Sequence, residues 1–67
     1  MVIINGEELD MAGKTVARYL KESGHDAAGV ARIAVERNGE IVFKTDYEHV
    51  VLEDGDKVEI VTFMGGG

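Results

Sequence analysis

The first eleven residues carry the pattern of two short strands. Residues 2–4 are apolar, and polar and apolar residues then alternate from Glu8 to Met11. The Asn5-Gly6 pair between the two segments favours a tight turn, because both residue types tolerate a positive φ. The pattern therefore predicts a β-hairpin at the start of the chain.

A helical spacing of apolar residues follows. Val16, Tyr19 and Leu20 recur at the positions of one helix face. Thr15 precedes them and is a residue type that caps a helix N-terminus through its hydroxyl. Gly24 suits the left-handed position that ends a helix. The sequence thus predicts one helix from Thr15 to the residue before Gly24.

Further strands are predicted in the second half, after a loop at residues 25–29. Asn38-Gly39 is again a turn dipeptide, and it joins two strand patterns. Thr45 and Glu48 have the spacing of a capping box, which favours a single helical turn. The strands are predicted at residues 33–37, 41–43 and 57–63. One helix must then cover one face of a mixed sheet, because neither element buries its apolar side alone.

The last predicted strand has two unlike faces. If Val58 and Ile60 face the helix, the alternation places Val61 and Phe63 on the open face of the sheet. An exposed aliphatic and aromatic pair indicates a docking patch for a partner, and Met64 extends it with an adaptable apolar contact. The alternative is that these side chains pack on neighbouring strands and complete the core.

Length and charge narrow the classes of function. The chain has 67 residues, which is one small domain, and a formal net charge of -6. Such an acidic domain repels nucleic acid and anionic membranes, so neither is an expected partner. No apolar run has the length of a membrane span and the first residues lack the pattern of a signal peptide, so we expect a cytoplasmic protein.

Candidate catalytic and metal-binding groups are few. The chain has no cysteine, so any sulfur chemistry must use sulfur brought from elsewhere. His25 and His49 have no ligand-like spacing, so no metal site is expected. Ser23 has no histidine and acid arrangement that would activate it. The acidic residues around Asp54 and Asp56 are interpreted as a solvated turn.

Three segments together carry a resemblance to a known family. They are residues 35–41 (VERNGEI), residues 54–61 (DGDKVEIV) and the ending at residues 61–67 (VTFMGGG). With the element order and the small size, they resemble the ThiS family over the whole chain. These proteins are sulfur carriers of thiamine biosynthesis. The resemblance implies an α+β fold of the β-grasp, ubiquitin-like type, with a mixed sheet of four to five strands and one main helix across one face.

The resemblance also implies a function for the end of the chain. Residues 1–64 would form the β-grasp domain, and Gly65, Gly66 and Gly67 a flexible tail that enters a partner's active site. An E1-like adenylating enzyme would use ATP and Mg²⁺ to adenylate the carboxylate of Gly67. Sulfur from a donor such as a cysteine desulfurase would convert it to a thiocarboxylate for thiazole synthase. The chain would be a protein co-substrate and not an enzyme, with no catalytic residue or bound cofactor of its own.

The chemistry of a carboxylate agrees with this implication. A carboxylate is a poor electrophile, and the sequence contains no phosphate-binding loop, so ATP must be bound by the partner. Glycine lacks Cβ and lets the backbone pass a narrow channel. The alternatives are an idle frayed end, a carrier for molybdopterin or cysteine synthesis, or a ubiquitin-like modifier that forms adducts with lysines.

Overall fold

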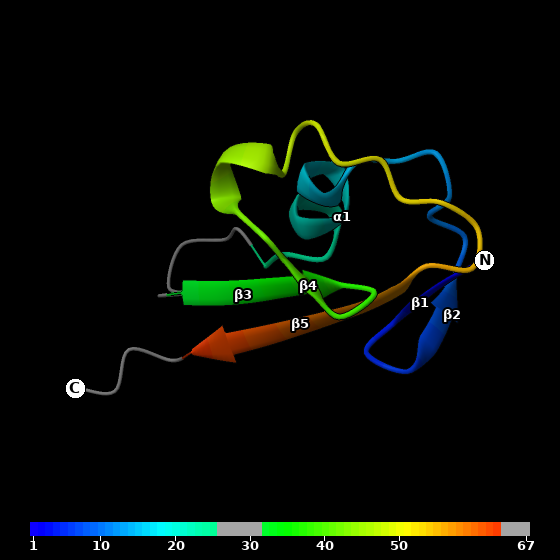
Figure 1. Cartoon of the computed structure of the whole chain (residues 1–67), viewed down its shortest axis with the longest axis horizontal. Helices are drawn as coiled ribbons and strands as arrows, with labels where there is room; N and C mark the ends of the chain where they lie inside the picture. The colour runs from blue at the N-terminus through cyan, green and yellow to red at the C-terminus, as the bar shows by residue number, and fades with distance from the viewer. Residues whose placement is uncertain (26–31, 64–67) are drawn as a thin grey trace.

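A five-stranded mixed sheet with one helix across one face makes up the computed structural model (Figure 1). The structure describes residues 1–25 and 32–63. The elements are β1 (Val2–Ile4), β2 (Glu7–Leu9), α1 (Val16–Glu22), β3 (Arg32–Arg37), β4 (Glu40–Val42), the 3-10 helix η1 (Lys44–Asp46) and β5 (Lys57–Phe63).

The order of the strands across the sheet is β2-β1-β5-β3-β4. β1 pairs in parallel with β5, with Ile4 opposite Val58, and β5 pairs antiparallel with β3 along its length. The first and last strands are therefore adjacent and parallel, and the last strand is central. This arrangement of strands and helix is the predicted β-grasp fold, which the structure confirms.

Both predicted ends of α1 are confirmed. Thr15 is the N-cap, and its Oγ1 accepts a hydrogen bond of 3.1 Å from the Arg18 N–H. At the other end Ser23 is the C-cap, and Gly24 follows with a φ of +82°. The left-handed conformation that Gly24 adopts is favourable for glycine, which has no Cβ to clash with the turn.

The core lies between α1 and the covered face of the sheet. Val16 and Leu20 are the buried residues of the helix. The other buried apolar side chains come from the strands and from the segments that flank them: Val2, Ile4, Met11, Val35, Leu52, Val58 and Ile60. Tyr19 and Tyr47 are partly buried against this cluster, as residues with an apolar ring and a polar hydroxyl commonly are.

Several boundaries differ from the sequence prediction by one or two residues. β2 ends at Leu9, because the chain turns there and the Met11 N–H donates to the Leu9 carbonyl at 2.9 Å. β4 ends at Val42, and Phe43 is the N-cap of η1 without a side-chain hydrogen bond. The single helical turn predicted here is confirmed, but Thr45 lies inside it and cannot cap it, so the capping-box interpretation was wrong. Most of the loop predicted at residues 25–29 lies outside the described residues.

Neither α1 nor η1, the helices within the described ranges, is long and apolar enough to cross a membrane.

Candidate partner-docking face and the strand that precedes the tail

The candidate site consists of β5, the face of the sheet that α1 leaves uncovered, and the residues that follow β5. The predicted modified residue Gly67, the tail residues Gly65 and Gly66, and the predicted contact residue Met64 lie outside the described residues. Their roles and the boundary of the tail at residue 65 stay predictions. The structure does locate Phe63, the last residue of the strand before them.

β5 is held at its middle by a side chain from the first hairpin. The backbone ladder between β1 and β5 reaches Val58, whose carbonyl accepts from the Asn5 N–H at 2.9 Å. The amide side chain of Asn5 then continues this ladder. Its Nδ2 donates to the Ile60 carbonyl at 3.2 Å, and its Oδ1 accepts from the Ile60 N–H at 2.7 Å. Asn5 thus supplies the hydrogen bonds that a further strand residue would supply.

The start of β5 is held by a buried carboxylate. Asp56 is only 7% exposed, so its interpretation as part of a solvated turn was wrong. Its carboxylate accepts hydrogen bonds from Arg37 Nε and the Glu53 N–H, both at 2.8 Å, and from Asn38 Nδ2 at 3.0 Å. Asn38 Oδ1 in turn accepts from the Lys57 N–H at 2.9 Å. The network joins the β3–β4 turn to the first residue of β5.

The environment of Asp56 favours its ionised form. Burial alone raises the pKa of Asp56, but the hydrogen bonds from Asn38, Glu53 and Arg37 and the charge of Arg37 together lower it below the ordinary value of 3.8. The carboxylate is therefore an anchor within the fold.

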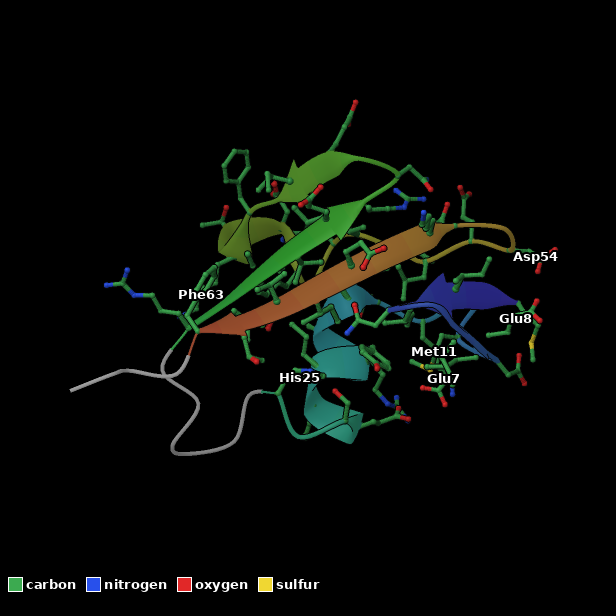
Figure 2. All side chains as sticks on the ribbon, turned by 90° about the horizontal axis from the view of Figure 1, so that it is seen from below. Glu7, Glu8, Met11, His25, Asp54 and Phe63 are labelled. Atoms are coloured by element: carbon green, nitrogen blue, oxygen red, sulfur yellow. The ribbon has the colours of Figure 1, made fainter. Side chains whose placement is uncertain are left out.

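The alternation predicted along β5 is confirmed. Val58 and Ile60 are buried, whereas Val61 and Phe63 are 48% and 52% exposed on the other face of the sheet. Figure 2 looks onto this uncovered face and shows Phe63 at the end of β5 that is farther from Asp54. Two apolar side chains thus stand exposed beside the start of the glycine tail. Their role in partner binding stays a prediction.

Two further apolar residues of the same face were not predicted from the sequence. Ile41 in β4 is 55% exposed, and Phe43 directly after it is 66% exposed. Val42 between them is partly buried against the core, so its two neighbours point the other way. The signal was present in the sequence, because the Asn38-Gly39 turn fixes the register of β4. We call these four residues the apolar patch: Ile41, Phe43, Val61 and Phe63.

The histidines do not join this face. His25 follows α1, where its Nδ1 lies 2.5 Å from Ser23 Oγ and its ring lies 6.1 Å from that of Tyr19. His49 lies in the turn after η1. Within residues 1–25 and 32–63, no three histidine, aspartate or glutamate side chains are grouped so that they could hold a metal ion.

Comparison with known proteins assigns the chain to a family. The model of the ThiS family matches residues 2–67. The sulfur carrier protein ThiS of Thermus thermophilus is 40% identical over 67 residues, which is the full length of both chains. The crystal structure of the thiamine biosynthesis protein ThiS from Geobacter metallireducens superposes with a TM-score of 0.73 at 32% identity, covering 98% of this chain and 97% of that one.

A second kind of relative is much longer. The thiazole synthase of Paramagnetospirillum magneticum is 51% identical over 67 residues, which is 98% of this chain but 20% of that protein. The thiazole synthase of Magnetococcus marinus shows the same relation at 38% identity. The chain therefore spans about a fifth of the length of these thiazole synthases. The residues matched by the family model, the fold and the similarity to full-length relatives together show that the chain belongs to the ThiS family.

Proposed function

We propose that this protein carries sulfur for thiamine biosynthesis on the carboxylate of Gly67. The observation that supports this most directly is membership of the ThiS family, with full-length similarity to a protein named as a sulfur carrier. The chain acts as a protein co-substrate in the cytoplasm. Its partners are an E1-like adenylating enzyme, a sulfur donor such as a cysteine desulfurase, and thiazole synthase.

The proposed reaction begins with activation of the carboxylate. An oxygen of the Gly67 carboxylate attacks the α-phosphorus of ATP on the adenylating enzyme, with Mg²⁺ bound to the nucleotide, and pyrophosphate leaves. The acyl carbon is now bonded to AMP, which is a good leaving group. Sulfide then bonds to this carbon and AMP departs, which leaves a thiocarboxylate. When the donor is a persulfide, its outer sulfur bonds to the acyl carbon and AMP departs. A thiol reductant then cleaves the S–S bond that still joins this sulfur to the donor, which leaves the thiocarboxylate.

The fold suits a carrier whose reactive group lies beyond its last strand. β5 is hydrogen-bonded to strands on both sides and is further fixed by Asn5 and Asp56. The position of Phe63 relative to the docking face is therefore defined. When the apolar patch binds the adenylating enzyme, the tail starts from a fixed point, and binding of the domain offsets the cost of ordering three glycines, about 1–2 kcal/mol each.

Thiazole synthase is proposed as the acceptor of the sulfur. Two proteins named thiazole synthase contain a region similar to this chain over nearly its whole length. A carrier domain joined covalently to an enzyme of that name supports the view that the separate carrier delivers to the same kind of enzyme.

The test is conversion of the carboxylate by purified components. The protein is incubated with an adenylating enzyme of the same organism, ATP, Mg²⁺ and sodium sulfide, and its intact mass is measured. Replacement of one oxygen by sulfur adds about 16 Da, an increment that oxidation of a methionine mimics. Accurate mass, or a reagent that alkylates only the thiocarboxylate, separates the two products.

Deletion of the last two glycines supplies the matched variant. Removal of Gly66 and Gly67 leaves every described residue in place but shortens the reach of the carboxylate by about 7 Å, at 3.5 Å for each residue. We expect no conversion of this variant. A normal rate of adenylation by the shortened chain, or formation of lysine adducts without any thiocarboxylate from the intact chain, would contradict the proposed function.

A further inference from the structure

Two carboxylates face each other in the middle of the uncovered sheet face. Glu36 of β3 lies directly opposite Glu59 of β5 in the antiparallel register. The Cβ atoms of such a pair are about 4.5–5.5 Å apart, and like charges at this spacing destabilise the sheet. In the part of the chain that the structure describes, neither carboxylate forms an ion pair or a side-chain hydrogen bond. The repulsion is therefore not compensated within these residues.

The basic residues near this pair form no ion pair with it among the described residues. Arg37 is the next residue after Glu36, but its side chain points to the opposite face and pairs with Asp56 and Glu53. Lys57 stands on the same face as Glu59, two residues earlier in β5, and makes no ion pair with it. Arg32 is opposite Phe63, at the far end of the β3–β5 ladder.

The pair borders the apolar patch on the side of β4 and on the side of the end of β5. Ile41 of β4 is directly opposite Glu36, so Ile41, Glu36 and Glu59 form one row across three strands. In the neighbouring part of the ladder, Val61 is opposite Ala34. Ile41 and Val61 are both about half exposed. A protein surface that covers these apolar side chains also removes water from the two carboxylates beside them.

The carboxylate pair beside the apolar patch determines which chemical groups a partner's surface must carry to bind this face of the sheet. Carboxylates removed from water without a partner have a large desolvation cost, which would cancel the gain from the apolar contacts. A surface that brings a cation to this point avoids that cost. A guanidinium suits it best, because its planar fork of five N–H donors can bond both carboxylates, and arginine is enriched at the centre of protein interfaces.

We infer that the adenylating enzyme binds this face with apolar side chains on the apolar patch and one arginine inserted between Glu36 and Glu59. The inference rests on the proposed function, which supplies the enzyme as partner. The arginine N–H groups donate to both carboxylates and relieve their repulsion. Relief of this repulsion on binding adds to the affinity for the enzyme. The hydrogen bonds of the arginine also fix the orientation of the domain on the enzyme.

The inference predicts opposite effects on stability and binding. Replacing both residues in the variant Glu36→Gln/Glu59→Gln removes the repulsion and keeps the size of the side chains. The free variant should unfold at a higher temperature than the unaltered protein. Its dissociation constant for the adenylating enzyme should rise about tenfold or more, because the inserted arginine loses both charged acceptors.

The experiment compares calorimetric titrations of the adenylating enzyme with four proteins. These are the unaltered chain, Glu59→Gln, the double variant, and the control Glu48→Gln. Glu48 is an exposed residue in the turn after η1, and this turn contacts α1 through the hydrogen bond from the Ala17 N–H to the Tyr47 carbonyl; its replacement removes the same single charge as Glu59→Gln. We expect the control to bind as the unaltered chain does, and the salt dependence of binding to be weaker in the double variant.

Each possible result decides one question. Equal affinity of the double variant and the control overturns the inference, even if thiocarboxylate still forms. A lower unfolding temperature of the double variant also overturns it, because the carboxylates would then have a stabilising role in the free chain. Failure of the unaltered chain to bind the enzyme and to be converted contradicts the proposed function instead.

Discussion

Asn5 and Ile60 are 55 positions apart in the sequence and exchange two hydrogen bonds. Asn5 has a φ of +51° in the turn between β1 and β2, so the same residue forms the turn and extends the sheet. Few residue types combine a tolerance of positive φ with an amide that both donates and accepts. The contact therefore makes the first hairpin part of the support of β5.

Replacement of Asn5 should separate its two roles. Asn5→Ala removes both hydrogen bonds and places an alanine at positive φ, so we expect the free energy of unfolding to fall by about 2–4 kcal/mol. Asn5→Gly removes the hydrogen bonds but permits the φ, and it should cost about 1–3 kcal/mol. Urea denaturation measures both. An Asn5→Gly variant as stable as the unaltered protein would show that the side-chain bonds to Ile60 contribute nothing.

The buried carboxylate of Asp56 should make stability depend on pH. Its pKa is lower in the folded protein than the ordinary value of 3.8, so its contribution is complete above that value. The contribution should decrease as the pH falls below 3.8 toward the folded pKa. Asp56→Asn should therefore be less stable than the unaltered protein at neutral pH, and the difference should shrink in acid. Urea midpoints at several pH values measure it, and a difference that does not change with pH would contradict the prediction.

Phe63→Asp should weaken binding of the adenylating enzyme without unfolding the domain. Phe63 is 52% exposed and lies outside the core, so its replacement leaves the packing of the sheet intact. A charge placed at an apolar interface loses its water without gaining a partner, and we expect at least about a tenfold loss of affinity by calorimetry. Val51→Asp is the control, because Val51 is equally apolar and 47% exposed but lies outside the sheet. Equal affinities of the two variants would place the docking surface elsewhere.

Phe43→Ser tests the part of the apolar patch at β4, which was not predicted from the sequence. Phe43 is 66% exposed, so the free energy of unfolding should change by less than about 0.5 kcal/mol. Binding of the adenylating enzyme should weaken by about three- to thirtyfold if the patch is continuous across β4 and β5. Titration calorimetry measures the affinity, and thermal unfolding checks the fold. Unchanged affinity would restrict the docking surface to the residues of β5.

Local patterns were enough to predict the elements of this fold. The N-cap of α1 at Thr15, the left-handed Gly24 after its C-cap and the bounds of β5 follow from residue type and periodicity, which act over a few positions. The exposure of Val61 and Phe63 follows from the same alternation once β5 is assigned. These predictions succeeded because each depends on neighbours in the sequence.

Contacts over long distances in the sequence were not predictable in this way. Asp56 belongs to a run of charges that is typical of an exposed turn, and only the folded position of Arg37 and Asn38 makes it a buried acceptor. The double hydrogen bond of Asn5 requires the parallel pairing of β1 with β5. Ile41 and Phe43 are a different case: β4 has three residues, too few for a clear alternation, so their exposure could be predicted only from the register that the Asn38-Gly39 turn fixes.

The central place of β5 in the sheet has a consequence for how the molecule forms during synthesis. Among residues 1–25 and 32–63, the hairpin of β1 and β2 and the hairpin of β3 and β4 are joined in one sheet only through β5. A nascent chain that still lacks residues 57–63 has two separate hairpins and no common sheet, and isolated two-stranded hairpins are marginal in water. Folding must therefore wait until the last strand has left the ribosome, so a chain cut short before β5 stays unfolded and open to proteases. Under the proposed function, the adenylating enzyme would then meet a completed docking face only on chains in which synthesis has passed β5.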